Sequence, residues 1–425
     1  MNHTRGLTWR RACRQTAAAV TLVVLLMGFT GCTGVGRAAT AQAGSSSAAP
    51  TGPAAAAPEP PTGAPSPGQQ TGEGPAGPDL VPYDGPVENL FFHPLVVYPE
   101  RAFDGDSLSQ GYDDWFVTVP EFKNILEALY RNGYVLIDIR DLYDLSEQDG
   151  KTALARRPLK VPRGRKPLIL SVDDLNYYDY MRDNGNARRL VLNAEGDVAA
   201  ESTDALGQTV VSTDDEVIPI LDAFVREHPD FSLRGARGVI ALTGYQGILG
   251  YGTHEPKAPG YEAERQDALR VAARLKATGW VFASHGWGHL PLARISQGVL
   301  QRDTERWKDQ VEPLAGSTPI YVFPHGSRVP MGDAKMHYLE EQGFRVFLSV
   351  GPSPYLESTR SYLLMDRRHI DGIALRTQRR LLLPLFDAKQ VIDSRRPAPA
   401  ARPPKPDASP APPATESPTG PAPPG

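Results

Sequence analysis

Residues 168–174 read Leu-Ile-Leu-Ser-Val-Asp-Asp, and residues 280–289 read Trp-Val-Phe-Ala-Ser-His-Gly-Trp-Gly-His. Each stretch is an apolar run that ends abruptly in carboxylate or imidazole side chains. Apolar runs of this length are typical of buried parallel strands. Polar residues directly after such strands lie at the carboxyl-terminal rim of a sheet or barrel, where α/β proteins place their chemistry. The two stretches therefore predict an α/β fold with a polar site at one rim.

The four side chains at these strand ends match a familiar set of metal ligands. Asp173 and Asp174 close the first stretch, and His285 and His289 lie at the end of the second. One carboxylate with two imidazoles binds zinc and similar ions and leaves coordination positions open for water and substrate. The other carboxylate is then free to act as a base. The spacing of the two histidines predicts that both rings lie on one side of a helical turn.

Composition divides the chain into one foldable region and two flanking segments. Residues 33–81 and 394–425 consist mostly of Ala, Gly, Pro, Ser and Thr, and they have too few apolar side chains to offset the entropy of ordering. We expect a disordered linker and a disordered tail. Residues 82–393 have the size of one large barrel domain. With a net charge of −4 and no basic stripe, nucleic acid is not an expected partner.

The N-terminus has the pattern of an export signal. Arginines between positions 5 and 14 precede an apolar run at 17–29 that is too short to span a bilayer. Residues 29–32, Phe-Thr-Gly-Cys, resemble a bacterial lipobox, so residues 1–32 are interpreted as a signal peptide. Lipidation of Cys32 would anchor the chain to membrane lipid on the extracellular face, and plain secretion is the alternative. The other cysteine lies inside the signal, so no disulfide is expected in the folded domain.

Strand and helix patterns alternate along the folded region. Helix signals begin at Thr118 and stop at Gly133, and a second helix is expected over 263–278. Thr213 and Glu216 have the spacing of a capping box for a further helix. Seven or eight strands interleaved with helices predict a closed or nearly closed parallel (β/α) barrel. The predicted strands are 89–97, 134–139, 168–172, 238–243, 280–284, 319–323, 344–350 and 370–375.

Two insertions break the alternation of strand and helix. Residues 175–212 contain a predicted hairpin that turns at 193–197, and residues 244–262 are rich in Gly and Tyr. Both insertions leave the carboxyl ends of predicted strands, where Tyr245 and His325 also fall. We therefore expect the insertions to wall the same face as the polar site, since long loops at such positions are usually functional.

The motifs at the strand ends resemble those of the NodB-homology polysaccharide deacetylases. Residues 171–174, Ser-Val-Asp-Asp, are similar to that family's Thr-Phe-Asp-Asp motif, and residues 285–289, His-Gly-Trp-Gly-His, are similar to its His-Ser/Thr-x-x-His motif. The resemblance covers roughly residues 90–375. It implies a distorted (β/α) barrel with fewer than eight full units. It also implies hydrolysis of N- or O-acetyl groups on carbohydrate with a divalent metal, for which zinc is the expected ion.

The resemblance also implies roles for single residues. Matched by position, Asp173 is the general base. Trp287 lies inside the second motif, and Tyr245 follows the predicted strand 238–243. Both are candidates for stacking on sugar rings, and packing within the loops is the alternative for each. The metal ligands by the same match are Asp174, His285 and His289.

The chain departs from the family at the third motif, Arg-x-Pro-Tyr-Gly, where it reads Val-Phe-Pro-His-Gly. Val322 replaces the arginine that orients the base, and Arg328 is one candidate for a substitute. Pro324 and Gly326 remain, so we expect the turn of this motif to persist on the substrate side. His325 replaces the tyrosine. Its backbone N–H is a candidate donor to the tetrahedral oxyanion, and its side chain is a candidate acid.

The late motifs of the family are also altered. We find no counterpart of the late Asp-Trp motif. The nearest match to the late histidine, which acts as the acid in the family, is His369 in the stretch Arg-Arg-His-Ile-Asp-Gly. His369 and His325 are therefore both candidates for protonating the leaving group. An earlier histidine, His93, interrupts the first apolar run at 89–97 and is a weaker candidate for a place at the rim.

These observations predict an extracellular, metal-dependent hydrolase that deacetylates a cell-wall or capsular carbohydrate. The loss of the arginine at Val322 and the altered late motifs favour an alternative, a non-catalytic glycan-binding lipoprotein on a degenerate barrel. A third interpretation keeps the hydrolase but gives it a small N-acyl substrate. In that case the insertions 175–212 and 244–262 would close an open groove into a pocket.

Overall fold

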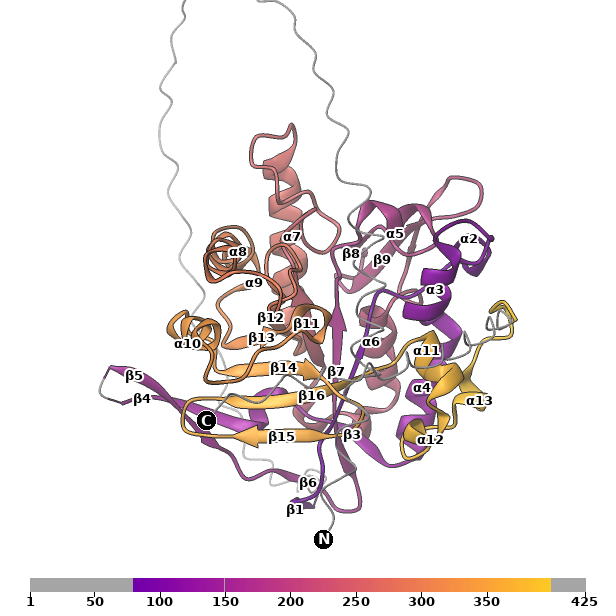
Figure 1. Cartoon of the computed structure of the whole chain (residues 1–425). Helices are drawn as coiled ribbons and strands as arrows, with labels where there is room; N and C mark the ends of the chain where they lie inside the picture. Colours follow the sequence, from indigo (N-terminus) through magenta and orange to yellow (C-terminus); the bar gives the residue numbers. More distant parts are fainter. Residues whose placement is uncertain (1–78, 149, 399–425) are drawn as a thin grey trace, which may run out of the picture. The chain divides into compact units, whose positions relative to one another are not determined.

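The computed structural model describes residues 79–148 and 150–398 (Figure 1). The predicted signal peptide with Cys32, nearly all of the predicted linker, and the tail beyond residue 398 lie outside the described residues. Among the described residues, none of the helices is both long and apolar enough to cross a membrane.

Within the described part of the chain, seven parallel strands close into a barrel. Their order around the ring is β7, β11, β12, β13, β14, β16, β2 and back to β7. The predicted α/β class and the predicted (β/α) barrel are confirmed. A further parallel strand, β3 (Tyr134–Leu136), pairs with the first half of β7 and stays outside the ring. The ring strands are β2 (Glu88–Phe92), β7 (Lys166–Asp173), β11 (Gly238–Leu242), β12 (Val281–Ser284), β13 (Ile320–Val322), β14 (Val346–Val350) and β16 (Leu363–His369).

The alternation of side chains along each strand decides which residues face the barrel interior. Leu363 and Met365 of β16 pack inside the barrel with Ile169 of β7. Because successive strand residues point to opposite faces, residues two and four positions further along point inward as well. Asp173 of β7 and Arg367 of β16 therefore both enter the interior near its carboxyl-terminal end.

Helices cover the outside of the barrel (Figure 1). Thr118 caps the helix predicted after it, through a capping box with Glu121, and Gly279 ends the second predicted helix in a left-handed conformation; both predictions are confirmed. The helices are α2 (Pro99–Ala102), α3 (Ser109–Trp115), α4 (Val119–Arg131), α5 (Asp179–Asp183), α6 (Val217–Glu227), α7 (Tyr261–Thr278), α8 (Gln297–Gln310), α9 (Glu312–Ala315), α10 (Ala334–Glu341), α11 (Gly372–Thr377), α12 (Arg379–Leu382) and α13 (Ala388–Val391). Short 3-10 turns are η1 (Ile139–Leu142), η2 (Pro229–Phe231), η3 (Leu233–Gly235) and η4 (Pro324–Gly326).

Two local predictions are wrong. The strand predicted at 370–375 does not form, because β16 ends at His369 and the next residues begin α11. Asp371 caps that helix by accepting a hydrogen bond from a first-turn N–H at 2.6 Å. The capping box predicted from Thr213 is also wrong. The residue that caps α6 is Glu216, whose own carboxylate accepts a hydrogen bond from the first N–H of the helix at 2.7 Å.

The predicted hairpin within 175–212 is confirmed, and it packs against the second insertion. The Asn193 N–H donates to the Asp197 carbonyl across its turn at 2.9 Å. The Leu190 N–H donates to the Leu249 carbonyl of the second insertion at 3.0 Å. Gly250 has a φ of +90° there, and a Cβ at this position would lie 2.4 Å from a backbone oxygen of the hairpin. The strands outside the ring are β8 (Arg189–Leu192), β9 (Val198–Thr203) and β10 (Thr209–Ser212) of this insertion, with β1 (Leu80–Pro82), β4 (Tyr143–Gln148), β5 (Lys151–Arg156), β6 (Lys160–Pro162) and β15 (Tyr355–Ser358) elsewhere.

Candidate metal centre and catalytic site

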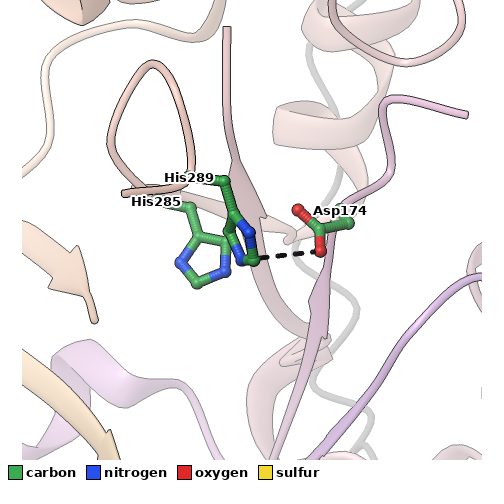
Figure 2. Close-up of side chains that lie close together, drawn as sticks. All are labelled: Asp174, His285 and His289. Atoms are coloured by element: carbon green, nitrogen blue, oxygen red, sulfur yellow. Dashed lines mark ion pairs between the residues drawn. The ribbon is translucent and has the colours of Figure 1, made fainter. Parts of the chain in front are cut away.

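Three of the predicted ligands converge at the carboxyl-terminal rim of the barrel. Asp174 directly follows β7, and His285 and His289 lie in the loop after β12. One ligand atom from each residue lies within 4.8 Å of the other two (Figure 2). We call this group of Asp174, His285 and His289 the ligand triad. Parallel pairing of β7 with β11 and of β11 with β12 brings the two segments together.

Both imidazoles of the ligand triad are prepared to bind a metal. The His285 Nδ1 lies 2.9 Å from the Val322 carbonyl oxygen, which can only accept, so Nδ1 carries the proton and Nε2 is free. Burial lowers the pKa of His285 to about 4. Burial, with His325 and His93 nearby, also lowers the pKa of His289 well below its usual range. Both rings are therefore neutral at neutral pH, which is the form that binds metal.

The carboxylate of Asp174 is held so that one oxygen remains free. The Tyr178 hydroxyl donates to Asp174 Oδ1 at 2.9 Å. The other oxygen, Oδ2, lies 3.8 Å from the Nε2 of His289. One carboxylate oxygen and two imidazole nitrogens fit a zinc-like ion, and a second group orients Asp174 and His285.

The loop that carries the two histidines is not the helical turn that their spacing predicts. Gly286 and His289 have φ values of +66° and +52°, so the chain curls through left-handed conformations. The Asp303 carboxylate of α8 accepts hydrogen bonds from the Trp287 N–H at 2.9 Å and the Gly288 N–H at 2.7 Å. A Cβ at Gly286 would lie 2.8 Å from that carboxylate, which accounts for glycine where the family has Ser or Thr.

Asp173 lies beside the ligand triad and is held by an arginine that the sequence analysis missed. Arg367 of β16 donates to Asp173 Oδ1 at 2.6 Å and to Oδ2 at 2.8 Å. Both side chains are buried. Asp173 Oδ2 also lies 3.7 Å from the Nε2 of His285. Burial alone would raise the pKa of Asp173, but the Arg367 guanidinium together with His285 holds that pKa well below its usual range.

Arg367, and not residue 322, is the residue that contacts the Asp173 carboxylate. Val322 is a buried residue of the barrel interior. Arg328, the substitute considered from the sequence, makes no hydrogen bond or ion pair with Asp173 within the described residues. Its charge acts instead on the pKa values of Tyr355, Glu357 and Asp366. The signal for Arg367 was the alternation of Leu363, Met365, Arg367 and His369, which the misplaced strand at 370–375 concealed.

His369 does not touch the ligand triad and instead reaches it through His93. The Nε2 of His369 lies 3.1 Å from the Nδ1 of His93, and its Nδ1 lies 2.9 Å from the Asp371 carboxylate. The Nε2 of His93 lies 3.9 Å from Asp174 Oδ2. His369 also stacks on Phe91 with ring centroids 4.3 Å apart. A row of Asp371, His369 and His93 therefore leads to the candidate metal position.

His325 lies on another side of the ligand triad. Its ring centroid is 4.2 Å from that of His289, and its Nε2 is 3.2 Å from the His289 carbonyl oxygen. The turn predicted from Pro324 and Gly326 is present as η4, with Pro324 buried. Gly326 has a φ of +61°, and a Cβ there would lie 2.8 Å from Val350. These two residues shape the turn that brings His325 to the site.

Of the two predicted aromatic platforms, Trp287 is already engaged on one face. The Arg306 guanidinium lies over its ring at 3.4 Å from the centroid, and its Nε1–H donates to the Gln310 side chain at 2.9 Å. Tyr245 stacks on Tyr178 with centroids 4.6 Å apart. Tyr178 is the residue that holds Asp174, so Tyr245 supports the wall of the site through it.

Comparison with known proteins gives matches to solved structures only. No protein-family model matches the chain, and no curated protein matches it. The deacetylase PplD of Streptococcus pyogenes, in complex with acetate, is 13% identical, with 69% of this chain and 94% of that chain covered and a TM-score of 0.38. IcaB from Ammonifex degensii is 9% identical, with 72% and 97% covered and a TM-score of 0.36. The chitin deacetylase of the fungal pathogen Colletotrichum lindemuthianum is 12% identical, with 41% and 76% covered and a TM-score of 0.23.

Proposed function

We propose that this chain is a divalent-metal-dependent hydrolase that removes N- or O-linked acetyl groups from an extracellular or cell-wall carbohydrate. The observation that carries the proposal is the place of Asp173, which lies against His285 but outside the ligand triad and is fixed by Arg367. Hydrolysis of an unactivated amide or ester needs an electrophilic ion and a separate base, and this arrangement supplies a position for each.

The ligand triad would hold the ion, and zinc is proposed because two imidazoles and one carboxylate leave coordination positions open. When bound, such an ion polarises the acetyl carbonyl and lowers the pKa of water from 15.7 to roughly 7. The protein's part is to fix the ligands in advance. Val322 orients His285, Tyr178 orients Asp174, and Asp303 fixes the loop between the two histidines.

Asp173 is proposed to take the proton from the attacking water. Arg367 donates a hydrogen bond to each carboxylate oxygen, so the Asp173 side chain cannot rotate away from the ligand triad. The same contact keeps the carboxylate ionised, which a base requires. The role that the family gives to the arginine of its third motif is thus proposed for a residue of β16.

A proton must also reach the leaving nitrogen or oxygen. The pair His369 and His93 is proposed to supply it, since Asp371 fixes one ring and the other lies beside Asp174. His325, next to His289, is proposed to stabilise the negative charge that develops on the acetyl oxygen. The sequence analysis left both acid candidates open, and the linked pair favours His369 acting through His93.

The proposed location is the outer face of the cell membrane. Residues 1–32 have the pattern of a lipoprotein signal, and Cys32 would carry the lipid. The Pro-rich linker 33–81 would then separate the barrel from the bilayer, because such segments are extended. Secretion without an anchor is the alternative.

The non-catalytic alternative loses its main support. It rested on the missing arginine at Val322 and on the altered late motifs. Arg367 binds Asp173, and His369 has the carboxylate partner Asp371. A small N-acyl substrate remains the second candidate, because the two insertions pack together beside the site as that interpretation expects. An acetyl donor series that runs from N-acetylglucosamine to long oligosaccharides would separate the two.

The test combines metal stoichiometry with acetate release. The full chain should bind one divalent ion per molecule, and this site should be lost in His285→Ala and His289→Ala. Asp173→Asn should keep the ion but lose acetate release from acetylated glycans by at least about a hundredfold. A folded wild-type chain that binds no ion would overturn the proposal. Loss of the ion in Asp173→Asn would show that the roles of the two aspartates are reversed.

A further inference from the structure

A cavity lined by charged side chains includes the residues that directly follow Tyr178 and Tyr245 in the sequence. Its volume is about 370 Å³, within the range of known ligand pockets. Asp179 and Gln246 line it. The backbone N–H of Asp179 donates a hydrogen bond to the side-chain oxygen of Gln246 at 3.0 Å. Each of the two directly follows one of the stacked tyrosines, Tyr178 and Tyr245, and Tyr178 binds Asp174. The two segments that carry these tyrosines therefore also form part of the cavity wall.

The carboxylates of this cavity are already engaged. Glu201 of β9 pairs with Arg189 of β8 through two contacts, at 2.9 and 3.0 Å. Glu264 of α7 accepts a hydrogen bond from the Gly252 N–H at 3.1 Å and lies 3.9 Å from Arg189. Both glutamates therefore contact Arg189, and Asp179 is the other carboxylate that lines the cavity beside Arg182 and Arg188.

The other two arginines of the cavity share a single ion pair, which is long. Arg182 of α5 donates to the Gly250 carbonyl at 3.1 Å, and its nearest carboxylate, 3.6 Å away, belongs to Asp179, whose side chain is 79% exposed. Arg188 makes one weak contact with the Thr203 hydroxyl at 3.5 Å and no ion pair within residues 79–148 and 150–398. Burial, opposed by Asp179 and assisted by Arg188, lowers the pKa of Arg182. An anion between Arg182 and Arg188 would relieve this repulsion.

We propose that this cavity binds an anionic substituent, a carboxylate or a phosphate, on a sugar that neighbours the acetylated sugar of the glycan. The inference rests on the proposed function for its glycan, and it narrows the substrate to acidic carbohydrates. The cavity is lined by charged and amide groups rather than by apolar side chains, which suits a hydroxylated, charged ligand. Arg182 and Arg188 bind the anion. Gln246 and His254 exchange hydrogen bonds with the hydroxyl groups of the sugar.

The insertions account for the cavity's position. Arg188 directly precedes β8 in the first insertion, and His254 belongs to the second. The close backbone contact at Gly250 fixes one insertion against the other, so the cavity is preformed and does not need a ligand to assemble it. A glycan with its acetyl group at the ligand triad would extend past Tyr178 toward Arg182.

The first arm of the test measures binding without catalysis. The full chain, stripped of metal by a chelator, is titrated with glucuronate, with inorganic phosphate and with glucose by calorimetry. Glucuronate or phosphate should bind and glucose should not. Arg182→Met and Arg188→Met should each weaken anion binding by at least about tenfold. Arg163→Met, at an exposed arginine between β6 and β7 that pairs with Asp79, is the matched control and should leave binding unchanged.

The second arm measures preference. The ratio of kcat/KM for acetylated oligosaccharides with and without a uronic acid or phosphate next to the acetylated sugar should exceed about ten in the wild type. It should fall to about one in Arg188→Met, whose side chain is exposed, so that misfolding is not the cause. If acetate is released with equal kcat/KM from oligosaccharides with and without the acidic neighbour, the inference is overturned and the proposed function stands. The same holds if the anion still binds in both Arg182→Met and Arg188→Met. Anion binding that depends on both arginines, with no acetate released from any glycan, would instead overturn the proposed function.

Discussion

Arg367 donates hydrogen bonds to both carboxylate oxygens of Asp173, although 194 residues separate the two in sequence. The guanidinium also contacts the Ser171 hydroxyl at 3.2 Å and lies over the Phe91 ring at 4.2 Å from its centroid. Neither side chain is solvated to any extent. Each charge is therefore stabilised chiefly by the other, and the pair fixes the direction in which Asp173 faces the ligand triad.

Removal of Arg367 should affect both folding and activity. Arg367→Ala leaves the Asp173 carboxylate buried and unpaired, so we expect the free energy of unfolding to fall by about 3–5 kcal/mol. Arg367→Lys keeps the charge but not the two parallel hydrogen bonds. We expect it to remain folded and to lose at least about tenfold in kcat. Urea denaturation and acetate release measure the two effects.

The control for this prediction is Arg328→Ala. Arg328 was the substitute considered from the sequence, but among the described residues it makes no hydrogen bond or ion pair with Asp173. We expect its removal to change the free energy of unfolding by less than about 0.5 kcal/mol and to leave kcat near the wild-type value. A loss of activity in Arg328→Ala as large as that in Arg367→Lys would contradict the assignment of the orienting role to β16.

Asp303 should control metal affinity without touching the metal. Its two oxygens accept hydrogen bonds from the Trp287 and Gly288 N–H groups and so fix the loop between the metal-binding histidines. Asp303→Asn keeps one acceptor and loses the other, so we expect the Kd for zinc to rise by about 10–100-fold. Competition with a chromophoric chelator measures this. The matched control is Asp309→Asn, an exposed position of the same helix, for which an equal loss of affinity would refute the proposed role of Asp303.

Sequence pattern predicted the parts of the site that depend on strand ends. An apolar strand followed directly by ligands places Asp174 and His285 at the barrel rim, because parallel strands present their carboxyl ends at one face. The pattern did not predict how the chain curls after β12. The histidine spacing suggested a helical turn, but Gly286 permits a left-handed backbone that a helix does not contain.

The missed residue, Arg367, reaches the site from β16, which is distant in sequence from β7, so the contact itself leaves no local pattern. His93, the weaker candidate for the rim, lies beside Asp174. The error over 370–375 added to this, because Asp371 caps a helix, and apolar Ile370 before it and the apolar residues 373–375 after it hide that boundary. If the strand is placed at 363–369 instead, the alternation of inward and outward side chains puts Arg367 inside the barrel.

Arg396 should be a major stabilising residue near the end of the described chain. Its buried guanidinium binds both oxygens of Glu121, at 2.5 and 2.7 Å, and the side chain of Asp113 at 3.1 Å. It thereby ties the C-terminal segment to α3 and α4. We expect Arg396→Ala to lower the free energy of unfolding by about 3–5 kcal/mol, because it leaves the buried Glu121 carboxylate without a charged partner. Urea denaturation monitored by tryptophan fluorescence measures this change.

The neighbouring arginine provides the control for this prediction. Arg395 pairs with Asp393 at 2.8 Å, but its side chain is 51% exposed. We expect Arg395→Ala to cost less than about 1 kcal/mol, since solvent screens such pairs. If Arg395→Ala and Arg396→Ala had the same effect, loss of net charge rather than loss of the buried contacts would account for both.

Glu216 should make the stability of the fold depend on pH. It is fully buried, and one carboxylate oxygen accepts hydrogen bonds from the N–H groups of Leu95 and Val217 at 3.2 and 2.7 Å. Burial, only partly offset by these bonds, raises the pKa of Glu216 to about 8. In the unfolded chain the group ionises near its ordinary value of 4.5. Between these values the folded state holds a proton that the unfolded state has released, so stability falls as pH rises through this window.

Glu216→Gln should remove this dependence, because a glutamine keeps the acceptor oxygen and cannot ionise. Relative to the wild type, the variant should gain up to about 1.4 kcal/mol of unfolding free energy per pH unit between roughly pH 4.5 and 8, and the gain should level off above that. Urea denaturation at half-unit pH steps measures the difference. Glu195→Gln, at an exposed turn, is the control and should follow the wild-type curve. Parallel curves for Glu216→Gln and the wild type would mean that the buried carboxylate is already ionised in the folded protein, and that the hydrogen bonds from Leu95 and Val217 outweigh its burial.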